Sequence, residues 1–250
     1  MMTTIVLTLE YDGTGLCGWQ KQPNQPSIEQ AVLDAIYAIS REHVEVSVAG
    51  RTDAGVHAQG QVASFSTQYN IPPKRWAGAL NAYLPNHIRV HQSVVRENFN
   101  ARYDSIAKRY RYRVYNGPHY PPLVANTSWH IRKELDISSM KEAAQFLIGE
   151  HDFEAFRTVH CDAPHAIRHI YSIAITQEAR APIGRMVDIV FHGNAFCRHM
   201  CRILAGTLIE VGQGKRSVQS VDEVLQSRDR TLGGMTAPPQ GLTLLEVEYP

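Results

Sequence analysis

The chain has 250 residues, of which 44% are hydrophobic and 20% charged, and its formal net charge at pH 7 is +1. This length can bury a core as one large domain or two small ones, and the composition excludes a disordered chain. The small net charge does not point to a nucleic-acid-binding protein, although a local basic stripe can still bind phosphates.

The N-terminus and the cysteines bear on the cellular compartment. Residues 1–4 lack the basic start of a secretory signal, and no apolar run approaches membrane-spanning length. The four cysteines, Cys17, Cys161, Cys197 and Cys201, form no dense disulfide framework. We expect a cytoplasmic protein with reduced thiols and no membrane partner.

The first half of the chain predicts the order strand, helix, strand, strand, helix, strand. The expected elements are a strand over 5–11, a helix over 28–39 that opens with a capping box at Ser27, strands over 44–48 and 62–65, a helix from Pro72 to Leu84, and a strand over 88–95. This order is the split βαβ arrangement of ferredoxin-like and RNA-recognition folds. It suggests a fold and not a function.

Glycines after the first strand form a G-x-G-x-x-G pattern over residues 13–18, which suggests a dinucleotide site. That fingerprint requires a helix to open at the glycines. Pro23 and Pro26 follow instead and prevent such a helix. We therefore reject a nucleotide cofactor at this loop.

The loop between the second and third expected strands carries two closely spaced charged residues between glycines. Gly50 and Gly55 frame Arg51 and Asp53. A neighbouring Arg keeps an Asp ionised, and a carboxylate anion can act as a nucleophile or a general base. The alternative is a surface ion pair in a turn, which needs no function. An aspartic-protease loop would require a second carboxylate, and the chain has no second copy of the loop.

A basic and aromatic segment opens the second half. In a strand over 108–116, one face would carry Tyr110, Tyr112 and Val114 and the other Arg109, Arg111 and Arg113. Arginine binds phosphates and tyrosine stacks on bases, so the pattern suggests RNA contact. A half-buried strand with a solvated arginine face explains it equally well.

The rest of the second half predicts further strands and helices. The expected elements are a helix over 138–146, strands over 170–177 and 186–191, a helix that opens at Asn194, a short helix over 221–225 and a last strand over 244–249. Cys197, His199 and Cys201 fall in the helix from Asn194 and suggest zinc. His199 would face away from both cysteines and no fourth ligand is in view, so we expect packed thiols and no metal.

Several segments resemble the tRNA pseudouridine synthase A family. They are Gly50-Arg51-Thr52-Asp53-Ala54-Gly55-Val56-His57, Tyr11-Asp12-Gly13 with Gly18-Trp19-Gln20, Arg109-Tyr110-Arg111-Tyr112, Asn194-Ala195-Phe196 and Gly241-Leu242. The resemblance implies that the protein isomerises uridine to pseudouridine at positions 38, 39 and 40 of the tRNA anticodon stem-loop, without a cofactor. A non-catalytic RNA-binding protein of the RNA-recognition type is the alternative.

The resemblance also implies roles for individual residues. Asp53 is the nucleophile or base, with Arg51 beside it and Arg202 as a second active-site arginine. Tyr110 and Leu242 would grip the base, and the stripe that includes Lys108, Arg109 and Arg111 would position phosphates. The family further implies a homodimer that binds tRNA.

The fold expected is α+β. It comprises two ferredoxin-like or RNA-recognition-like subdomains, 1–104 with the catalytic loop and 105–250 with the RNA-binding strand and the dimer-forming elements. Mainly antiparallel sheets would carry helices on their outer faces, with an active-site cleft between the subdomains.

Overall fold

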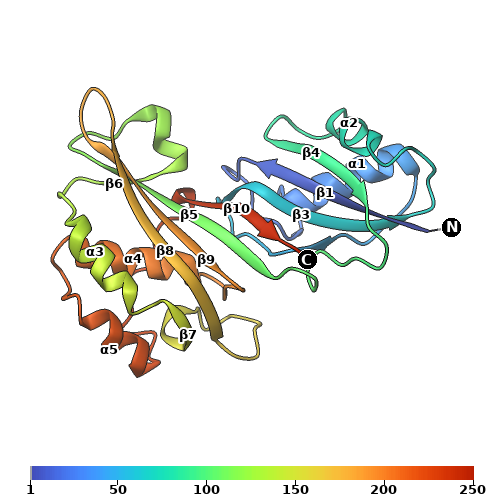
Figure 1. The fold of residues 1–250 in the computed structure, drawn as a ribbon. Helices are drawn as coiled ribbons and strands as arrows, with labels where there is room; N and C mark the ends of the chain where they lie inside the picture. The colour runs from blue at the N-terminus through green and yellow to red at the C-terminus, as the bar shows by residue number, and fades with distance from the viewer. Residues whose placement is uncertain (1) are drawn as a thin grey trace. The chain divides into compact units, whose positions relative to one another are not determined.

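The computed structural model describes residues 2–250, which form two compact units (Figure 1). Unit 1 comprises residues 2–106 with Thr243–Pro250, and unit 2 comprises Ala107–Leu242. Both units combine helices with mainly antiparallel strands, so the predicted mixed α+β class is confirmed. The domains 1–104 and 105–250 stay a prediction. In residues 2–250, no helix has the length and apolar character needed to span a membrane.

Unit 1 has the expected order of elements. They are β1 (Thr3–Tyr11), α1 (Ile28–Ser40), β2 (Ser47–Val48), β3 (His57–Thr67), α2 (Arg75–Asn81), β4 (Ile88–Val95) and β10 (Leu242–Glu248), of which residues 243–248 belong to this unit. β1 pairs antiparallel with β3 on one side and β4 on the other, and β2 pairs antiparallel with β3. β10 adds a short parallel pairing at the start of β3, which places it beside the candidate loop.

The core of unit 1 lies between its strands and its two helices. Leu7 and Leu9 of β1 are fully buried, and Trp76 of α2 packs edge-on against Phe65 of β3, with 5.1 Å between the ring centroids. The Ser27 half of the predicted capping box is confirmed, because the Ser27 hydroxyl accepts the Gln30 backbone N–H at 3.3 Å, whereas the Gln30 side chain donates to Asp34. The helical stripe therefore faces the core as its periodicity predicts.

Two elements of unit 1 are shorter than expected. The strand predicted over 44–48 is reduced to Ser47–Val48, the two residues that pair with Ser64 and Ala63 of β3. The helix predicted from Pro72 to Leu84 is regular only over Arg75–Asn81, since the two prolines form turns whose carbonyls accept the N–H groups of Arg75 and Trp76.

Unit 2 combines strands with three α-helices among its described residues. Its elements are β5 (Ala107–Asn116), η1 (Pro122–Thr127), β6 (Trp129–Ile131), α3 (Ile137–Gln145), β7 (Gly149–Asp152), η2 (Glu154–Phe156), β8 (Ile167–Ala179), β9 (Arg185–Gly193), α4 (Met200–Gly212), α5 (Ser220–Ser227) and η3 (Pro239–Gly241). The strand order is β5-β9-β8-β7, all antiparallel, and β6 pairs parallel with β5.

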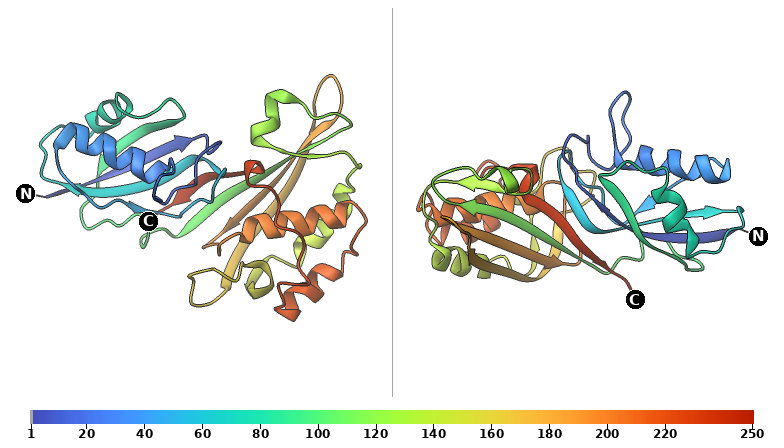
Figure 2. Two further views of the ribbon diagram at one scale, coloured as in Figure 1. Left: turned by 180° about the vertical axis from the view of Figure 1, so that it is seen from behind. Right: turned by 90° about the horizontal axis from the view of Figure 1, so that it is seen from above.

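Helix α4 is the centre of the unit 2 core. It contacts β5 and α3, and Figure 2 shows it lying along the strands. Ile203, Leu204 and Leu208 are fully buried. A Cβ on Gly212 would lie 2.6 Å from the Met140 sulfur, so glycine permits the close approach of α3 to α4.

The helix predicted to open at Asn194 begins instead at Met200. The Asn194 carboxamide accepts the backbone N–H groups of His169 and Ala195, which ties this residue, just after the end of β9, to the start of β8. His199 then adopts a φ of 64°, which interrupts helical geometry just before Met200. A side-chain hydrogen bond therefore outcompetes the helical pattern here.

Candidate active site

The loop between β2 and β3 carries Arg51 and Asp53. The Val56 N–H donates to the Asp53 carbonyl at 3.1 Å, which closes a turn directly after the carboxylate residue. Gly55 lies within this turn at a φ of 77°, a backbone conformation that favours glycine. Asp53 is therefore presented at the entry of a tight turn of fixed geometry.

Burial alternates along this loop. Thr52 is buried, Arg51 before it is exposed, and Asp53 after it is half-buried. The loop thus anchors itself through the threonine and leaves both charged side chains accessible. This arrangement suits a carboxylate that must meet a large substrate.

The glycine-rich segment after β1 packs beneath the loop. The Trp19 N–H donates to the Thr52 carbonyl at 3.0 Å. A Cβ on Gly18 would lie 2.5 Å from that same carbonyl oxygen, and a Cβ on Gly13 would overlap the Val56 carbonyl. The glycines therefore allow two backbones to meet, and no helix begins before Ile28. Buried Trp19 contributes its backbone and its packing against Tyr11.

Three buried polar side chains connect the loop to the strands. The Tyr11 hydroxyl lies 2.8 Å from the Thr52 hydroxyl, and the Gln61 Nε2 group donates to the Tyr11 hydroxyl at 3.1 Å and to the Gly50 carbonyl at 2.8 Å. Tyr11, Thr52 and Gln61 are all less than 9% exposed. They hold the loop on both sides of Arg51.

His57 and Asp12 form a second contact below the loop. The Gly13 N–H donates to the His57 Nδ1 atom at 3.1 Å, which lies at the same distance from an Asp12 carboxylate oxygen. Burial alone would raise the pKa of Asp12, but the hydrogen bonds from Thr14 and the nearby His57 outweigh it and lower the pKa.

In unit 2, strand β5 has the predicted alternation of faces. Tyr110 and Tyr112 are buried while Arg109 is exposed. The Tyr110 ring packs edge-on against Phe196 at 5.3 Å between centroids. The Tyr112 hydroxyl donates to the Pro238 carbonyl at 2.8 Å. Tyr110 is thus held in a defined orientation by an aromatic neighbour.

The predicted basic stripe is not uniform. Lys108 is only 8% exposed, on the tyrosine side of β5, and burial together with the nearby Arg168 lowers its pKa to about 8. Burial also lowers the pKa of half-buried Arg111. Arg113 donates through two nitrogens to Asp188, at 2.8 and 2.7 Å. Arg109 is the exposed arginine of the strand.

Arg202 and Leu242 lie on either side of one short segment. Arg202, on α4, donates through Nε to the Ala237 carbonyl at 2.8 Å, and the Ala237 N–H donates back to the Arg202 carbonyl at 3.1 Å. Burial raises the pKa of Tyr112, and the charge of Arg202 opposes that rise. Leu242 is buried at the start of β10. Arg202, Tyr112 and the segment before Leu242 therefore belong to one neighbourhood.

The predicted site residues thus fall into two groups. Unit 1 holds Arg51 and Asp53, and unit 2 holds Tyr110, Arg202 and Leu242.

Cys197 and Cys201 were predicted to lie in one helix, and the structure differs from this prediction. Cys197 precedes α4, whereas Cys201 lies within it. Cys197 and Cys201 are both buried. Among residues 2–250, no group of three or more His, Cys, Asp or Glu side chains has a metal-binding arrangement.

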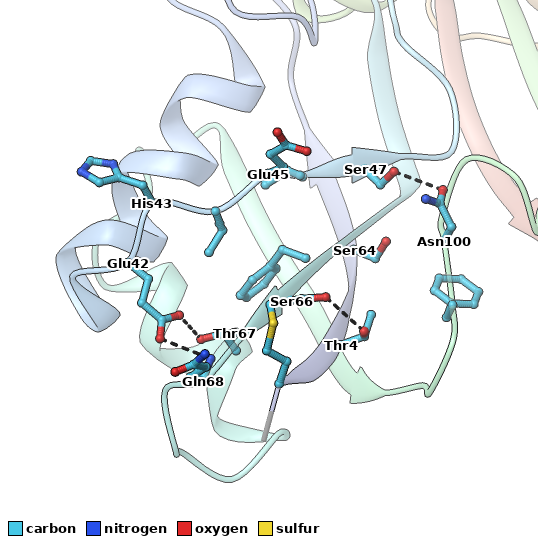
Figure 3. A pocket seen from close by; sticks show the side chains of 15 residues that line it. Thr4, Glu42, His43, Glu45, Ser47, Ser64, Ser66, Thr67, Gln68 and Asn100 are labelled. Atoms are coloured by element: carbon cyan, nitrogen blue, oxygen red, sulfur yellow. Dashed lines mark hydrogen bonds between the residues drawn. The ribbon is translucent and has the colours of Figure 1, made fainter.

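A polar pocket of about 740 Å³ lies elsewhere in unit 1 (Figure 3). Its hydroxyl groups are engaged with neighbours, since Ser47 donates to Asn100, Ser66 contacts Thr4, and Thr67 donates to Glu42. None of the predicted site residues lines it. The loop therefore stays the candidate active site, and this pocket is separate from the predicted site residues.

Sequence reasoning gave no role to several residues that support the candidate site. They are Tyr11, His57, Gln61, Tyr112, Phe196 and Ala237. Four of them lie inside the segments that resemble the family, and this position was the signal that could have identified them: Tyr11, His57, Tyr112 and Phe196. Gln61 and Ala237 gave no comparable signal.

Comparison with known proteins places the sequence in context. The family described as tRNA pseudouridine synthase matches residues 8–104 and 143–250. A protein named tRNA pseudouridine synthase A from Geotalea uraniireducens (strain Rf4) is 45% identical over 99% of this chain and 100% of its own length. One of the same name from Myxococcus xanthus is 47% identical over 99% of this chain and 92% of its own.

Among solved structures, the crystal structure of a Cbf5-Nop10-Gar1 complex is similar, with a TM-score of 0.37 and 14% sequence identity. The match covers 96% of this chain and 48% of that chain, and a likeness this low assigns no fold.

Proposed function

Because the chain belongs to the tRNA pseudouridine synthase family, we propose that it isomerises uridine at positions 38, 39 and 40 of the tRNA anticodon stem-loop, with Asp53 as nucleophile or base. The chain is an isomerase that forms pseudouridine in tRNA. The observation that carries the role of Asp53 is its loop, which buries Thr52 and leaves the neighbouring carboxylate accessible.

The reaction needs little beyond one well-placed carboxylate. The bond from ribose C1′ to base N1 breaks, the base turns, and C5 bonds to C1′ while a proton leaves C5 and N1 gains one. Atoms and electrons balance within the substrate, so no oxidant or energy source is consumed. Asp53 could attack base C6, attack ribose C1′ or remove the C2′ proton, and each route uses the carboxylate anion.

The arginines and the base-gripping residues complete the proposal. Arg51, adjacent in sequence to buried Thr52, places a positive charge on the same loop as Asp53. Arg202 supplies a second positive charge from α4, where the Ala237 carbonyl fixes its Nε atom. Tyr110 and Leu242 contact the uracil after it leaves the base stack, which costs a few kcal/mol. The edge-on packing of Tyr110 on Phe196 supports this role, because it fixes the ring plane.

RNA binding is assigned to Lys108, Arg109 and Arg111. Arg109 is exposed. Arg111 is half-buried, and burial lowers its pKa. These residues contact phosphates and position the RNA without reading its sequence. Recognition then depends mainly on RNA shape.

The assembly is part of the same proposal. We assign a ferredoxin-like subdomain to each half, a homodimer in solution and a cytoplasmic location. The β4-β1-β3-β2 order of unit 1 supports the first of these. Native mass spectrometry that detects only monomer would overturn the dimer.

The test is pseudouridine formation in unmodified tRNA, read by carbodiimide labelling and primer extension. We expect product at the anticodon arm with the parent, and a loss of about 10³-fold or more with Asp53→Asn while tRNA binding persists. The matched control is Asp34→Asn, an exposed carboxylate on α1 that only accepts from Gln30. A parent that binds tRNA and yields no product would favour the non-catalytic RNA-binding alternative.

A further inference from the structure

The polar side chains of Tyr11, Thr52 and Gln61 lie where apolar residues would ordinarily fill a core. Tyr11 is 2% exposed and Gln61 fully buried, and they come from the neighbouring strands β1 and β3. Each buried polar group costs free energy unless it is hydrogen-bonded. All three are hydrogen-bonded, and the partners include the loop that carries Asp53.

The hydrogen bonds form a directed chain. The Gln61 carboxamide oxygen accepts the Val62 N–H at 3.2 Å, so its Nε2 group carries the two donors. One donor goes to the Gly50 carbonyl and the other to the Tyr11 hydroxyl. The Tyr11 hydroxyl in turn lies 2.8 Å from the Thr52 hydroxyl, and either group can donate this hydrogen bond. Burial raises the pKa of Tyr11 to about 12, so its hydroxyl keeps its proton at neutral pH.

The chain fixes the backbone on both sides of Arg51. Gly50 is held through its carbonyl and Thr52 through its side chain. The Thr52 carbonyl is held separately by the Trp19 N–H. Thr52 is therefore fixed by side chain and main chain together, and Asp53 is the next residue.

We propose that Tyr11, Thr52 and Gln61 are positioning residues that set the orientation of the Asp53 carboxylate for catalysis. This inference rests on the proposed role of Asp53. Buried polar networks that are fully satisfied select one arrangement of the backbone, whereas apolar packing tolerates several. An error of about 1 Å in the placement of a catalytic group costs on the order of 10²-fold in rate.

Two variants test the network by removing one hydroxyl each. Tyr11→Phe and Thr52→Val keep the side-chain volume close to the original and delete the central hydrogen bond. We expect kcat to fall about 10- to 100-fold with KM for tRNA unchanged. Thr52→Ser restores the hydroxyl, and we expect it to recover most of the lost kcat.

The matched control is Tyr249→Phe in the same unit. The Tyr249 hydroxyl donates to the Ala101 carbonyl at 2.8 Å, far from the loop in the chain, and burial likewise raises its pKa. We expect this variant to lose thermal stability as Tyr11→Phe does and to keep the parent kcat. All rates are measured well below the unfolding midpoint of each variant, which circular dichroism supplies.

The outcomes separate this inference from the proposed function. A selective fall of kcat in Tyr11→Phe and Thr52→Val, with recovery in Thr52→Ser, supports the positioning role. Equal kcat in Tyr11→Phe, Tyr249→Phe and the parent overturns it and leaves Asp53 untouched. If Asp53→Asn retains the parent rate, the proposed function fails instead, whatever the network variants do.

Discussion

The loop around Asp53 and the strand around Tyr110 are stabilised by different kinds of contact. Neutral groups anchor the loop on both sides of Arg51, through backbone amides, a threonine, a glutamine and a tyrosine, and the Asp12 carboxylate enters only at its end, against His57. Charged and aromatic groups stabilise the strand around Tyr110: Phe196 packs against its ring, Lys108 is buried on the same face, and the Arg113–Asp188 pair lies on the opposite face.

The difference matches what each region has to do. A reacting carboxylate needs a fixed position, and uncharged hydrogen bonds provide one without adding charges that compete with it. A strand that meets phosphates needs positive charge, and part of that charge must itself be held in place. The comparison predicts that small steric changes damage the loop most, while changes of charge act on the strand.

Apart from loss of the Asp53 carboxylate itself, the largest effect is expected from Gly18→Ala. The new Cβ would lie 2.5 Å from the Thr52 carbonyl oxygen and 2.8 Å from the Asp53 carbonyl carbon, both backbone atoms that cannot move aside cheaply. We expect a loss of about 10²-fold in single-turnover rate and a loss of about 1–3 kcal/mol in the free energy of unfolding.

Gly15→Ala separates steric overlap from backbone strain. Gly15 also has a positive φ, of 76°, but no atom lies within 4 Å of an added Cβ. We expect a loss of about 1 kcal/mol in urea unfolding and a parent-like rate. Equal loss of rate in both variants would show that strain, and not contact with the loop, is responsible.

Arg202→Lys should have the next largest effect. Lysine keeps the charge but loses the planar guanidinium that donates to the Ala237 carbonyl. We expect kcat to fall about 10- to 100-fold with little change in the unfolding midpoint.

The control is Arg230→Lys, because Arg230 also donates to this segment, at Thr236. Should both variants lose kcat equally, Arg202 acts by holding the segment and not by its position near the substrate.

The element order and the catalytic loop could be predicted from sequence because both are local. Apolar periodicity gave the strands and helices of unit 1, and the contiguous run from Gly50 to His57 drew attention to Asp53. Two differences from the predicted elements are the shortened strand before β3 and the late start of α4. Both depend on tertiary contacts, such as the hydrogen bonds that the Asn194 side chain accepts from His169 and Ala195.

The network beneath the loop could not be predicted, because it depends on register. Gln61 meets Tyr11 only because β1 and β3 pair with Leu9 opposite Gln61 and a shift of register before Tyr11. The burial of Lys108 was within reach, since the alternation that exposes Arg109 places Lys108 on the side of the tyrosines.

The lowered pKa of Lys108 predicts a smaller effect, a dependence of tRNA affinity on pH. Its pKa is lowered to about 8, so its charge is lost as pH rises through 8 while the arginines stay charged. We expect tRNA affinity, measured by filter binding, to weaken a few-fold between pH 7 and 9, and Lys108→Arg to remove that dependence.

The free energy of unfolding should change with pH in the opposite direction to the tRNA affinity. Between pH 8 and the ordinary lysine range near 10.5, the unfolded chain binds a proton that the folded chain does not. Stability therefore rises with pH over this window. Lys108→Met should remove this rise, and urea unfolding at pH 8 and pH 10 measures it. An unchanged rise in Lys108→Met would assign it to another group.

The smallest expected effects are those of replacing Arg113 or Arg109, two arginines on the same face of β5. Arg113 is bound by Asp188 through two nitrogens, so Arg113→Gln should lower the free energy of unfolding by about 1 kcal/mol and leave tRNA binding nearly unchanged. Arg109→Gln should instead reduce the slope of log affinity against log salt by about one. If the two variants change the salt slope equally, Arg113 exchanges Asp188 for phosphate when tRNA binds.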